Sequence, residues 1–480
     1  MNAPLVYDAL KNAAQKWPNS PAVYDEYGVL TFDQLFSETE ILKNKLLELG
    51  IASGMGIGVM SRNSRNFIIG IFSVVGCGAT AMPMSHQLKK AEIDDILSEA
   101  KLHGIMDDQH GVCPIEEAHE MIKMNIESYR FAFTSISKKQ QFAPHVENPA
   151  FIRFTSGTTG KSKGVIISHQ SAIERVDAAN KVLNLSVGNT VVWVLPMAYH
   201  FVVSILLYIR HGAAIAIAKD FLSKNIIDIT NAHNGTLLYA SPMQIRLLAS
   251  DISGNMMPSL KMVISTSAAI SLDICKSFKK RFNINISQAY GIIEIGLPMI
   301  NYIKSEENSD AVGYALPDYS VEIFDEHNNP LPCGKIGHLA IKGPGMFDAY
   351  LSPPTLRKDV LKNGYFLTAD FASKTEDGLI KIEGREKSMI NVSGNKVFPE
   401  EVEGVLETIP EIKLARISGT PHALMGQIIQ AELVLYDGKI VDIEEVLTYC
   451  RKRLSTYKIP QRIKIVNALP MTGSGKILRC

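Results

Sequence analysis

A loop rich in glycine and hydroxyl residues, 154–164, most constrains what this chain folds into. It reads Phe-Thr-Ser-Gly-Thr-Thr-Gly-Lys-Ser-Lys-Gly and lies between Phe151–Phe154 and the apolar run Val165–Ile167. Its glycines allow tight turns and bring backbone N–H groups close to a ligand, while the hydroxyls and Lys163 add donors and a positive charge. The segment therefore predicts an anion-binding loop. Its spacing differs from that of a Walker A loop, so a bound nucleotide would be held in another way.

The length of the chain predicts more than one hydrophobic core. At 480 residues it exceeds what one core supports, so we expect a large region and a smaller one. Lys plus Arg and Asp plus Glu are equal at 49 each, which argues against nucleic acid or an anionic membrane as a partner. The N-terminal residues lack a signal-peptide pattern, and the most apolar run, Phe201–Ile209, is shorter than a membrane span. We expect no transmembrane segment and a cytoplasmic location.

Local patterns predict alternating helices and strands up to about residue 110, which favours an α/β layer architecture. Val29–Leu35 predicts a strand that runs into a helix capped by Thr31. Weak periodicity from Asp107 to Pro149 predicts a surface connection. Near the C-terminus, a helix that begins at Pro399 and an apolar stripe that begins at Ile443 predict a small α+β domain.

Several further segments place polar or aromatic residues where predicted strands end. They are Pro196–His200, Ser265–Ala269, Gln288–Glu294, Thr368–Asp370, Glu383–Ser388 and Pro470–Cys480. In this order, and together with the loop 154–164, they resemble the motifs of the adenylate-forming superfamily. That superfamily includes acyl- and aryl-CoA ligases, peptide-synthetase adenylation domains and beetle luciferases. The resemblance spans nearly the whole chain.

The resemblance implies a fold as well as a chemistry. It implies an α/β protein with a large, multi-subdomain N-terminal region of layered sheets and helices, followed by a small, mobile α+β C-terminal domain. We expect an AMP-binding adenylation domain over residues 1–387 and a small domain over 388–480, which would carry the catalytic Lys476.

The resemblance also implies roles for particular residues. Catalytic roles fall to Lys476, His200, Glu294 and Thr155. Magnesium ligands would be Thr155 and Glu294, because Mg²⁺ takes hard oxygen ligands. Asp370 would accept hydrogen bonds from the ribose diol, and Tyr290 would stack on adenine. The full set of implied nucleotide contacts is Thr155, Ser156, Gly157, Thr158, Thr159, Gly160, Lys163, Ser267, Ala268, Ala289, Tyr290, Gly291, Asp370, Ile382, Arg385 and Lys476.

The chain departs from the superfamily pattern at several positions. Ile293 stands where relatives carry a Thr whose hydroxyl meets the α-phosphate, so a donor is missing. Ala369 replaces a glycine, which we expect to be tolerated only at a negative φ. Ser388 stands at the hinge, and Ser265–Ala269 replaces a glycine-rich segment, which predicts a modified substrate pocket.

The implied reaction joins a fatty or aryl carboxylic acid to ATP, which gives an acyl-adenylate and pyrophosphate, and then passes the acyl group to a thiol. The implied cofactors are ATP/AMP, Mg²⁺ and CoA, or the phosphopantetheine of a carrier protein. Because His200–Leu207 contains no acid, a substrate with an amine would bury its charge unpaired and is disfavoured.

Three alternatives stay open from the sequence. The chain could load an acyl carrier protein rather than CoA, or act as an oxygen-using, luciferase-like enzyme. It could also bind a nucleotide without turnover, in view of Ile293, Ala369 and Ser388.

Overall fold

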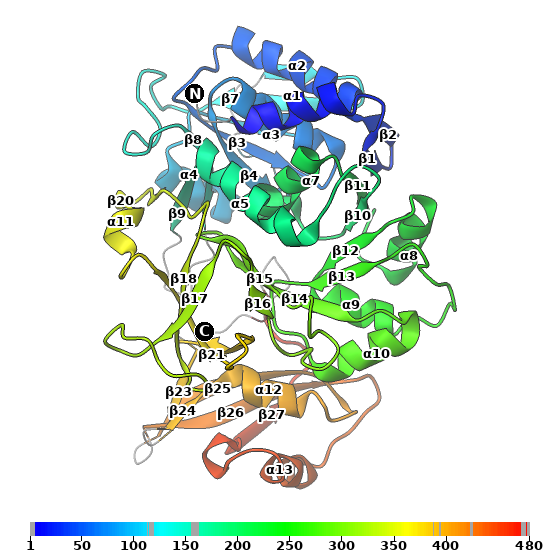
Figure 1. Ribbon diagram of the computed structural model, residues 1–480, viewed down its shortest axis with the longest axis vertical. Coiled ribbons are helices and arrows are strands. Elements are labelled where there is room, and N and C mark those ends of the chain that lie inside the picture. The colour runs from blue at the N-terminus through cyan, green and yellow to red at the C-terminus, as the bar shows by residue number, and fades with distance from the viewer. Residues whose placement is uncertain are drawn as a thin grey trace.

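The computed structural model describes residues 5–112, 114, 120–154, 163–386, 388–392, 395–422, 426–471 and 477. Within this part of the chain there are two large β-sheets, a smaller third sheet and a C-terminal sheet (Figure 1). The predicted α/β architecture, with a large N-terminal region and a smaller C-terminal domain, is confirmed. The C-terminal sheet lies at the lower end of the molecule in Figure 1.

The first large sheet is parallel in its centre and antiparallel at both edges. Its strands, in spatial order, are β2 (Gly28–Thr31), β1 (Pro21–Asp25), β11 (Ala214–Ile217), β10 (Thr190–Trp193), β12 (Leu237–Ala240), β13 (Met262–Ser265), β14 (Ile286–Ile292), β15 (Gly296–Ile300) and β16 (Tyr314–Ala315). Parallel neighbours need crossover connections, and helices supply them here. They are α8 (Ser223–Ala232), α9 (Pro242–Ala249) and α10 (Leu272–Phe282).

The second large sheet follows the same plan. Its strands, in spatial order, are β6 (Glu120–Lys123), β7 (Ser128–Phe133), β5 (Gly104–Asp107), β3 (Gly56–Ser61), β4 (Thr80–Ser85), β8 (Pro149–Phe154), β9 (Gly164–Ser168), β19 (Ala349–Tyr350) and β20 (Thr355–Leu356). Strands β5, β3, β4 and β8 are parallel, and the strands outside them are antiparallel. Helix α4 (Lys90–Ala100) supplies Ile93 to the core on the outer face of this sheet.

One continuous core joins the inner faces of the two large sheets. It includes buried residues of α1 (Val6–Lys16), α2 (Phe32–Glu48), α3 (Arg65–Gly76), α5 (His169–Leu183), α6 (Met197–His200), the π-helix η1 (Phe201–Ile205) and α7 (Leu206–His211). Strand residues alternate between this core and separate outer cores, as the pleat requires. In β8, for example, Phe151 belongs to the inner core and Ile152 to an outer one.

The third sheet is antiparallel and carries part of the candidate site. Its strands are β17 (Ser320–Phe324), β18 (Gly337–Lys342), β21 (Phe366–Lys374) and β22 (Ile380–Arg385). Strands β17 and β18 pair antiparallel, with Val321 opposite Ile341. The short helix α11 (Arg357–Val360) precedes β21.

The C-terminal domain has a sheet and a core of its own. Its elements are β23 (Ile390–Val392), β24 (Asn395–Val397), α12 (Pro399–Leu406), β25 (Ile412–His422), β26 (Gly426–Leu435), α13 (Ile443–Arg451), the 3-10 helix η2 (Thr456–Lys458) and β27 (Arg462–Ile465). Val402 of α12 and Val446 of α13 lie in that core, as their stripes predict. Arg246 of α9 ties the domain to the large region by donating to the Lys413 carbonyl at 2.6 Å and to Glu407 at 3.3 Å.

The prediction of a surface connection from Asp107 to Pro149 is wrong in part. Strands β6 and β7 form a hairpin there, and β7 pairs with β5. Tyr129 and Phe131, two residues apart on β7, are each 1% exposed. The apolar alternation covers only a few residues, so it is too short to stand out from a loop.

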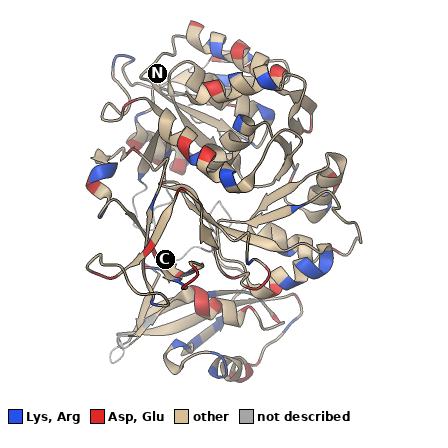
Figure 2. Ribbon diagram, viewed as in Figure 1, with Lys and Arg blue, Asp and Glu red and all other residues tan. Residues whose placement is uncertain are grey.

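The surface carries mixed charge. Figure 2 shows Lys and Arg interspersed with Asp and Glu on the helices, consistent with the balanced composition. Of the helices in the described residues, none combines the length and the apolar character that crossing a membrane would take.

Gly313 marks a point at which the fold has no room for a side chain. Its φ is +94°, and a Cβ would lie 2.3 Å from backbone atoms of Asn301. Gly188 has a similar φ of +92°, but nothing lies within 4 Å of the position of its Cβ.

We expect Gly188→Ala to lower the free energy of unfolding by about 1–2 kcal/mol, which is the cost of a left-handed conformation. Gly313→Ala should cost about 1–3 kcal/mol more, because the backbone must also move to relieve the overlap. Thermal unfolding of the two variants measures the difference. Equal losses in the free energy of unfolding would contradict the close approach of the Asn301 backbone to position 313.

Candidate active site

The predicted anion-binding loop connects two antiparallel neighbours in the second large sheet. Phe154 at the end of β8 pairs with Gly164 at the start of β9, so the two ends of the loop lie side by side. Lys163 places its Nζ 4.8 Å from the centre of the Tyr350 ring. The other predicted loop residues, together with Lys476, lie outside the described residues. They are Thr155, Ser156, Gly157, Thr158, Thr159 and Gly160.

Asp370, Tyr290 and Arg385 form a hydrogen-bonded cluster from three strands. The hydroxyl of Tyr290, on β14, donates to Oδ2 of Asp370, on β21, at 2.5 Å. Arg385, opposite Asp370 on β22, donates from Nε to Oδ1 at 3.1 Å. Burial and the Asp370 charge raise the pKa of Tyr290 well above its usual value, so the phenol keeps its proton and donates. The structure therefore brings together three of the predicted nucleotide contacts.

Ala369, just before this cluster, differs from the expected conformation. Its φ is +62°, in the left-handed region, so the expectation of a negative φ is wrong. The Ala369 carbonyl accepts a hydrogen bond from the Glu386 N–H at 3.0 Å, which helps to hold the turn. The chain thus keeps a glycine-like conformation with an alanine, at a cost of about 1–2 kcal/mol.

Further predicted contacts lie at the carboxyl edge of the first large sheet. They are Ser267, Ala268, Ala289 and Gly291. Ser265 of β13 pairs with Gln288 of β14, so the residues that follow each strand lie close together. Ser267 has a φ of +75°, a second strained turn at this edge. Ile382 lies on β22, half-buried, and pairs with Ala372. Ligands of open α/β sheets bind at such edges.

Glu294 lies in the turn between β14 and β15 and is partly buried. The Tyr350 hydroxyl lies 3.3 Å from its Oε1 and donates to it. Burial raises the pKa of Glu294, and the charges of Arg153 and Arg175 partly oppose that rise. A partly buried carboxylate that accepts one hydrogen bond from a hydroxyl is a suitable oxygen ligand for a hard cation such as Mg²⁺.

Arg175, which sequence reasoning missed, holds this turn in place. It is 1% exposed and donates from Nη1 to the Ile293 carbonyl at 2.9 Å. Its Nε and Nη2 donate to the Gly345 carbonyl at 2.8 and 2.6 Å. The signal in the sequence is an arginine on the apolar face of α5, between the buried Ala172 and Val176.

His200 ends α6 among aromatic side chains. Its ring centre lies 5.6 Å from that of Trp193 and 6.0 Å from that of Tyr239. The residues after it are mostly core, since Phe201 and Val202 are at most 2% exposed. His200 is therefore held at the end of β10 by packing.

Arg153, also missed from the sequence, lies on β8 immediately before Phe154. Its Nη1 donates to the Tyr199 carbonyl, and its guanidinium lies 5.0 Å from the centre of the Tyr199 ring. Its Nε is shielded from solvent and has no hydrogen-bond partner. Burial lowers the pKa of Arg153 to about 10, so the group is still a cation at neutral pH.

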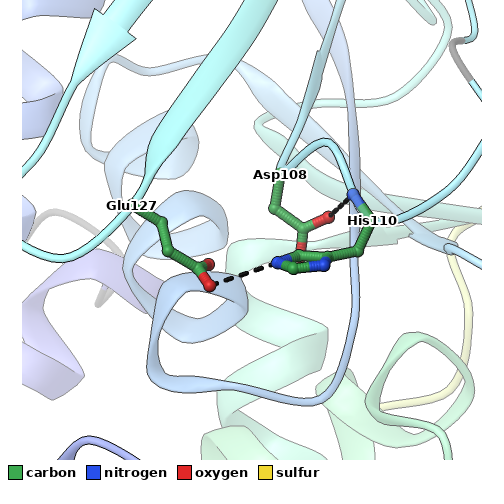
Figure 3. Close-up of side chains that lie close together, drawn as sticks. All are labelled: Asp108, His110 and Glu127. Carbon is green, nitrogen blue, oxygen red and sulfur yellow. Dashed lines mark hydrogen bonds and ion pairs between the residues drawn. The ribbon is translucent and has the colours of Figure 1, made fainter.

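A separate group of potential metal ligands, Asp108, His110 and Glu127, lies near the β6–β7 hairpin (Figure 3). The carboxylate oxygens of this group already accept hydrogen bonds. Nε2 of His110 lies 3.1 Å from Oε1 of Glu127, and Arg62 donates to the same oxygen at 2.6 Å. The second Glu127 oxygen accepts from Asn66 at 2.7 Å, and Asp108 accepts from the backbone N–H groups of Arg62 and His110. A guanidinium within this cluster opposes a cation, so the contacts serve to join the hairpin to α3.

Comparison with known proteins finds relatives that match nearly the whole chain. A long-chain-fatty-acid–CoA ligase of Yersinia pestis is 25% identical over 98% of this chain and 92% of its own length. A fatty acid–[acyl-carrier-protein] ligase, ScoC of Streptomyces coeruleorubidus, is 25% identical over 97% of this chain and 93% of its own. The fold matches that of O-succinylbenzoate coenzyme A synthetase from Bacillus subtilis in complex with AMP, with a TM-score of 0.85, 20% identity, and coverage of 100% of this chain and 98% of that one.

Models of protein families assign the chain to a family. The model of the AMP-binding enzyme C-terminal domain matches residues 401–476. The model of the AMP-binding enzyme matches residues 10–351, well over half of the chain. The protein therefore belongs to the AMP-binding enzyme family, within the adenylate-forming superfamily.

Proposed function

We propose that this protein activates a fatty or aryl carboxylic acid with ATP and transfers the acyl group to a thiol. In the first step a carboxylate oxygen attacks the α-phosphorus of ATP, and pyrophosphate leaves. In the second step a thiol sulfur attacks the acyl carbon, a thioester forms and AMP leaves. The observation that carries the proposal is the Asp370, Tyr290 and Arg385 cluster at the edge of the first large sheet, in a member of the AMP-binding enzyme family.

The residues have distinct proposed roles. Asp370 would accept hydrogen bonds from the ribose diol; the Tyr290 hydroxyl and Arg385 already orient its two oxygens. Loop residues 155–163 would hold the phosphates with backbone and hydroxyl donors. Thr155 and Glu294 would hold Mg²⁺, which when bound neutralises phosphate charge. His200 would lie over the acyl group.

The small domain would supply Lys476 to the first step. We propose that it begins at about residue 388 and turns on a hinge at Ser388, so that a different face meets the thiol in the second step. The Arg246 contacts to Lys413 and Glu407 would then have to break between the two steps. CoA and the phosphopantetheine of a carrier protein are the two acceptors to compare.

A pyrophosphate-release panel tests the function. The panel contains fatty acids, aryl acids and amino acids, each with ATP alone, with CoA and with a phosphopantetheinylated carrier protein. We expect an uncharged acyl or aryl acid to give the fastest release, since no acid in His200–Leu207 pairs with an amine. An amino acid as the best substrate would overturn this specificity, and ATP binding without release for any acid would favour a protein without turnover.

Asp370→Ala should raise the KM for ATP about 10- to 100-fold, because the ribose would lose hydrogen bonds to a charged acceptor. Asp377→Ala removes another ion-paired aspartate, bonded to Lys304 on the surface, and should leave the KM for ATP unchanged. Initial-rate kinetics over a range of ATP concentrations compares the two variants. An unchanged KM in Asp370→Ala would mean that the ribose is held elsewhere.

Lys476→Ala should slow adenylate formation roughly 10²–10³-fold, the size typical of losing one electrostatic donor in a transition state. Supplied with pre-made acyl-adenylate and CoA, the same variant should form thioester at nearly the wild-type rate. Single-turnover measurement separates the two steps, with Lys464→Ala, an exposed residue of β27, as the control. Equal impairment of both steps would contradict the division of labour between two domain orientations.

A further inference from the structure

Arg153, which is partly buried, has fewer polar partners than the buried arginines Arg65 and Arg175. Arg65 forms an ion pair with Asp25, and the guanidinium nitrogens of Arg175 donate to backbone carbonyls. In the part of the chain that the structure describes, Arg153 has one hydrogen bond, to the Tyr199 carbonyl, and its shielded Nε has no partner. Among the described residues, no carboxylate forms an ion pair with it. Because a partly buried cation with a shielded, unbonded N–H and no ion-paired carboxylate is costly, this arrangement indicates a site for an anion.

The position of Arg153 shows where that anion would lie. Phe151, two residues earlier on β8, packs in the inner core against Phe201, so the pleat directs Arg153 to the same face. On that face Arg153 meets Tyr199, which directly precedes His200. It also lies close enough to Glu294 for the carboxylate charge to favour its protonated form. Arg153 thus contacts the residue that directly precedes the proposed acyl-group residue, one position before strand β8 ends at the loop 155–162.

We propose that Arg153 binds the reacting carboxylate of the acid substrate and holds it for attack on the α-phosphorus of ATP. This inference rests on the proposed function and adds a residue to it. The loop and a metal are assigned to the phosphates and Lys476 to the transition state, whereas none of these groups is assigned to the acid carboxylate in the bound ground state.

The chemistry of the step agrees with a binding role. One carboxylate oxygen forms a bond to the α-phosphorus, the bond from that phosphorus to the pyrophosphate oxygen breaks, and no proton needs to move. The carboxylate carries its full charge before the step and loses it as the new bond forms. Arg153 therefore acts mainly on the bound ground state, so its removal should raise the KM for the acid more than it lowers kcat.

The test compares a carboxylic acid with the primary alcohol of the same carbon skeleton. The acid is the one with the fastest pyrophosphate release in the panel, and binding of both probes is measured by calorimetry with AMP present. We expect the wild type to bind the carboxylate about 10- to 100-fold more tightly than the alcohol, since the free energy of one hydrogen bond to a charged group corresponds to an affinity ratio of this size. In Arg153→Gln that preference should be lost, while alcohol binding and the KM for ATP stay close to the wild-type values.

Two further variants make the result specific. Arg153→Lys keeps the charge and should recover part of the preference. Arg210→Gln removes a partly buried arginine of α7 that pairs with Asp177 of α5, and the affinities for both probes should stay at the wild-type values.

Three outcomes would overturn the inference. The first is a carboxylate preference that survives in Arg153→Gln. The second is an equal loss of both affinities, which would assign Arg153 to packing. The third concerns short dicarboxylates, measured in the same way. If Arg153→Gln loses a preference for dicarboxylates over monocarboxylates but keeps the preference for the acid over its alcohol, Arg153 binds the tail of the substrate instead. Pyrophosphate release by the wild type would still stand in each case, so failure of this inference is distinct from failure of the proposed function.

Discussion

The buried guanidinium of Arg175 links the elements on which the candidate site depends. From α5 it donates to the carbonyls of Ile293 and Gly345, the first after β14 and the second before β19. Strand β14 belongs to the first large sheet and β19 to the second, so one side chain relates the two sheets at this point. The charge is tolerated in the core because Nε, Nη1 and Nη2 each have an acceptor. Glu294 follows Ile293 directly, and its place depends on this contact.

The site forms where strands end and the backbone turns. Ser267 and Ala369, at two of these turns, both have a left-handed backbone conformation although neither is a glycine. Such strain persists only where the surrounding structure holds it, and the antiparallel pairing of β21 with β22 does so beside Ala369. The same pairing sets Arg385 opposite Asp370. The strained turn and the polar cluster are thus two results of one strand register.

Much of the local structure could be predicted because its causes lie within a few residues. Thr31 caps α2 through a reciprocal contact with Gln34, and the apolar stripes of α12 and α13 follow a helical period. The β6–β7 hairpin was missed because its strands are short, and its burial depends on pairing with β5. The φ of Ala369 was wrong for a related reason, since residue type alone disfavours the conformation that the turn imposes.

The sequence by itself determined the family, the order of the motifs and the chemical character of the loop at 154–164, because residue type and spacing carry that information directly. Only the tertiary structure decided which side chains meet. Tyr290 and Asp370 are 80 residues apart and come from different sheets, yet their hydrogen bond orients the carboxylate. In the sequence, Arg153 is one polar residue in an apolar strand. The packing of β8 against Tyr199 then leaves its charge without a carboxylate partner in the described part of the chain. Such contacts depend on sheet order and strand register, which are properties of the whole fold rather than of any short segment.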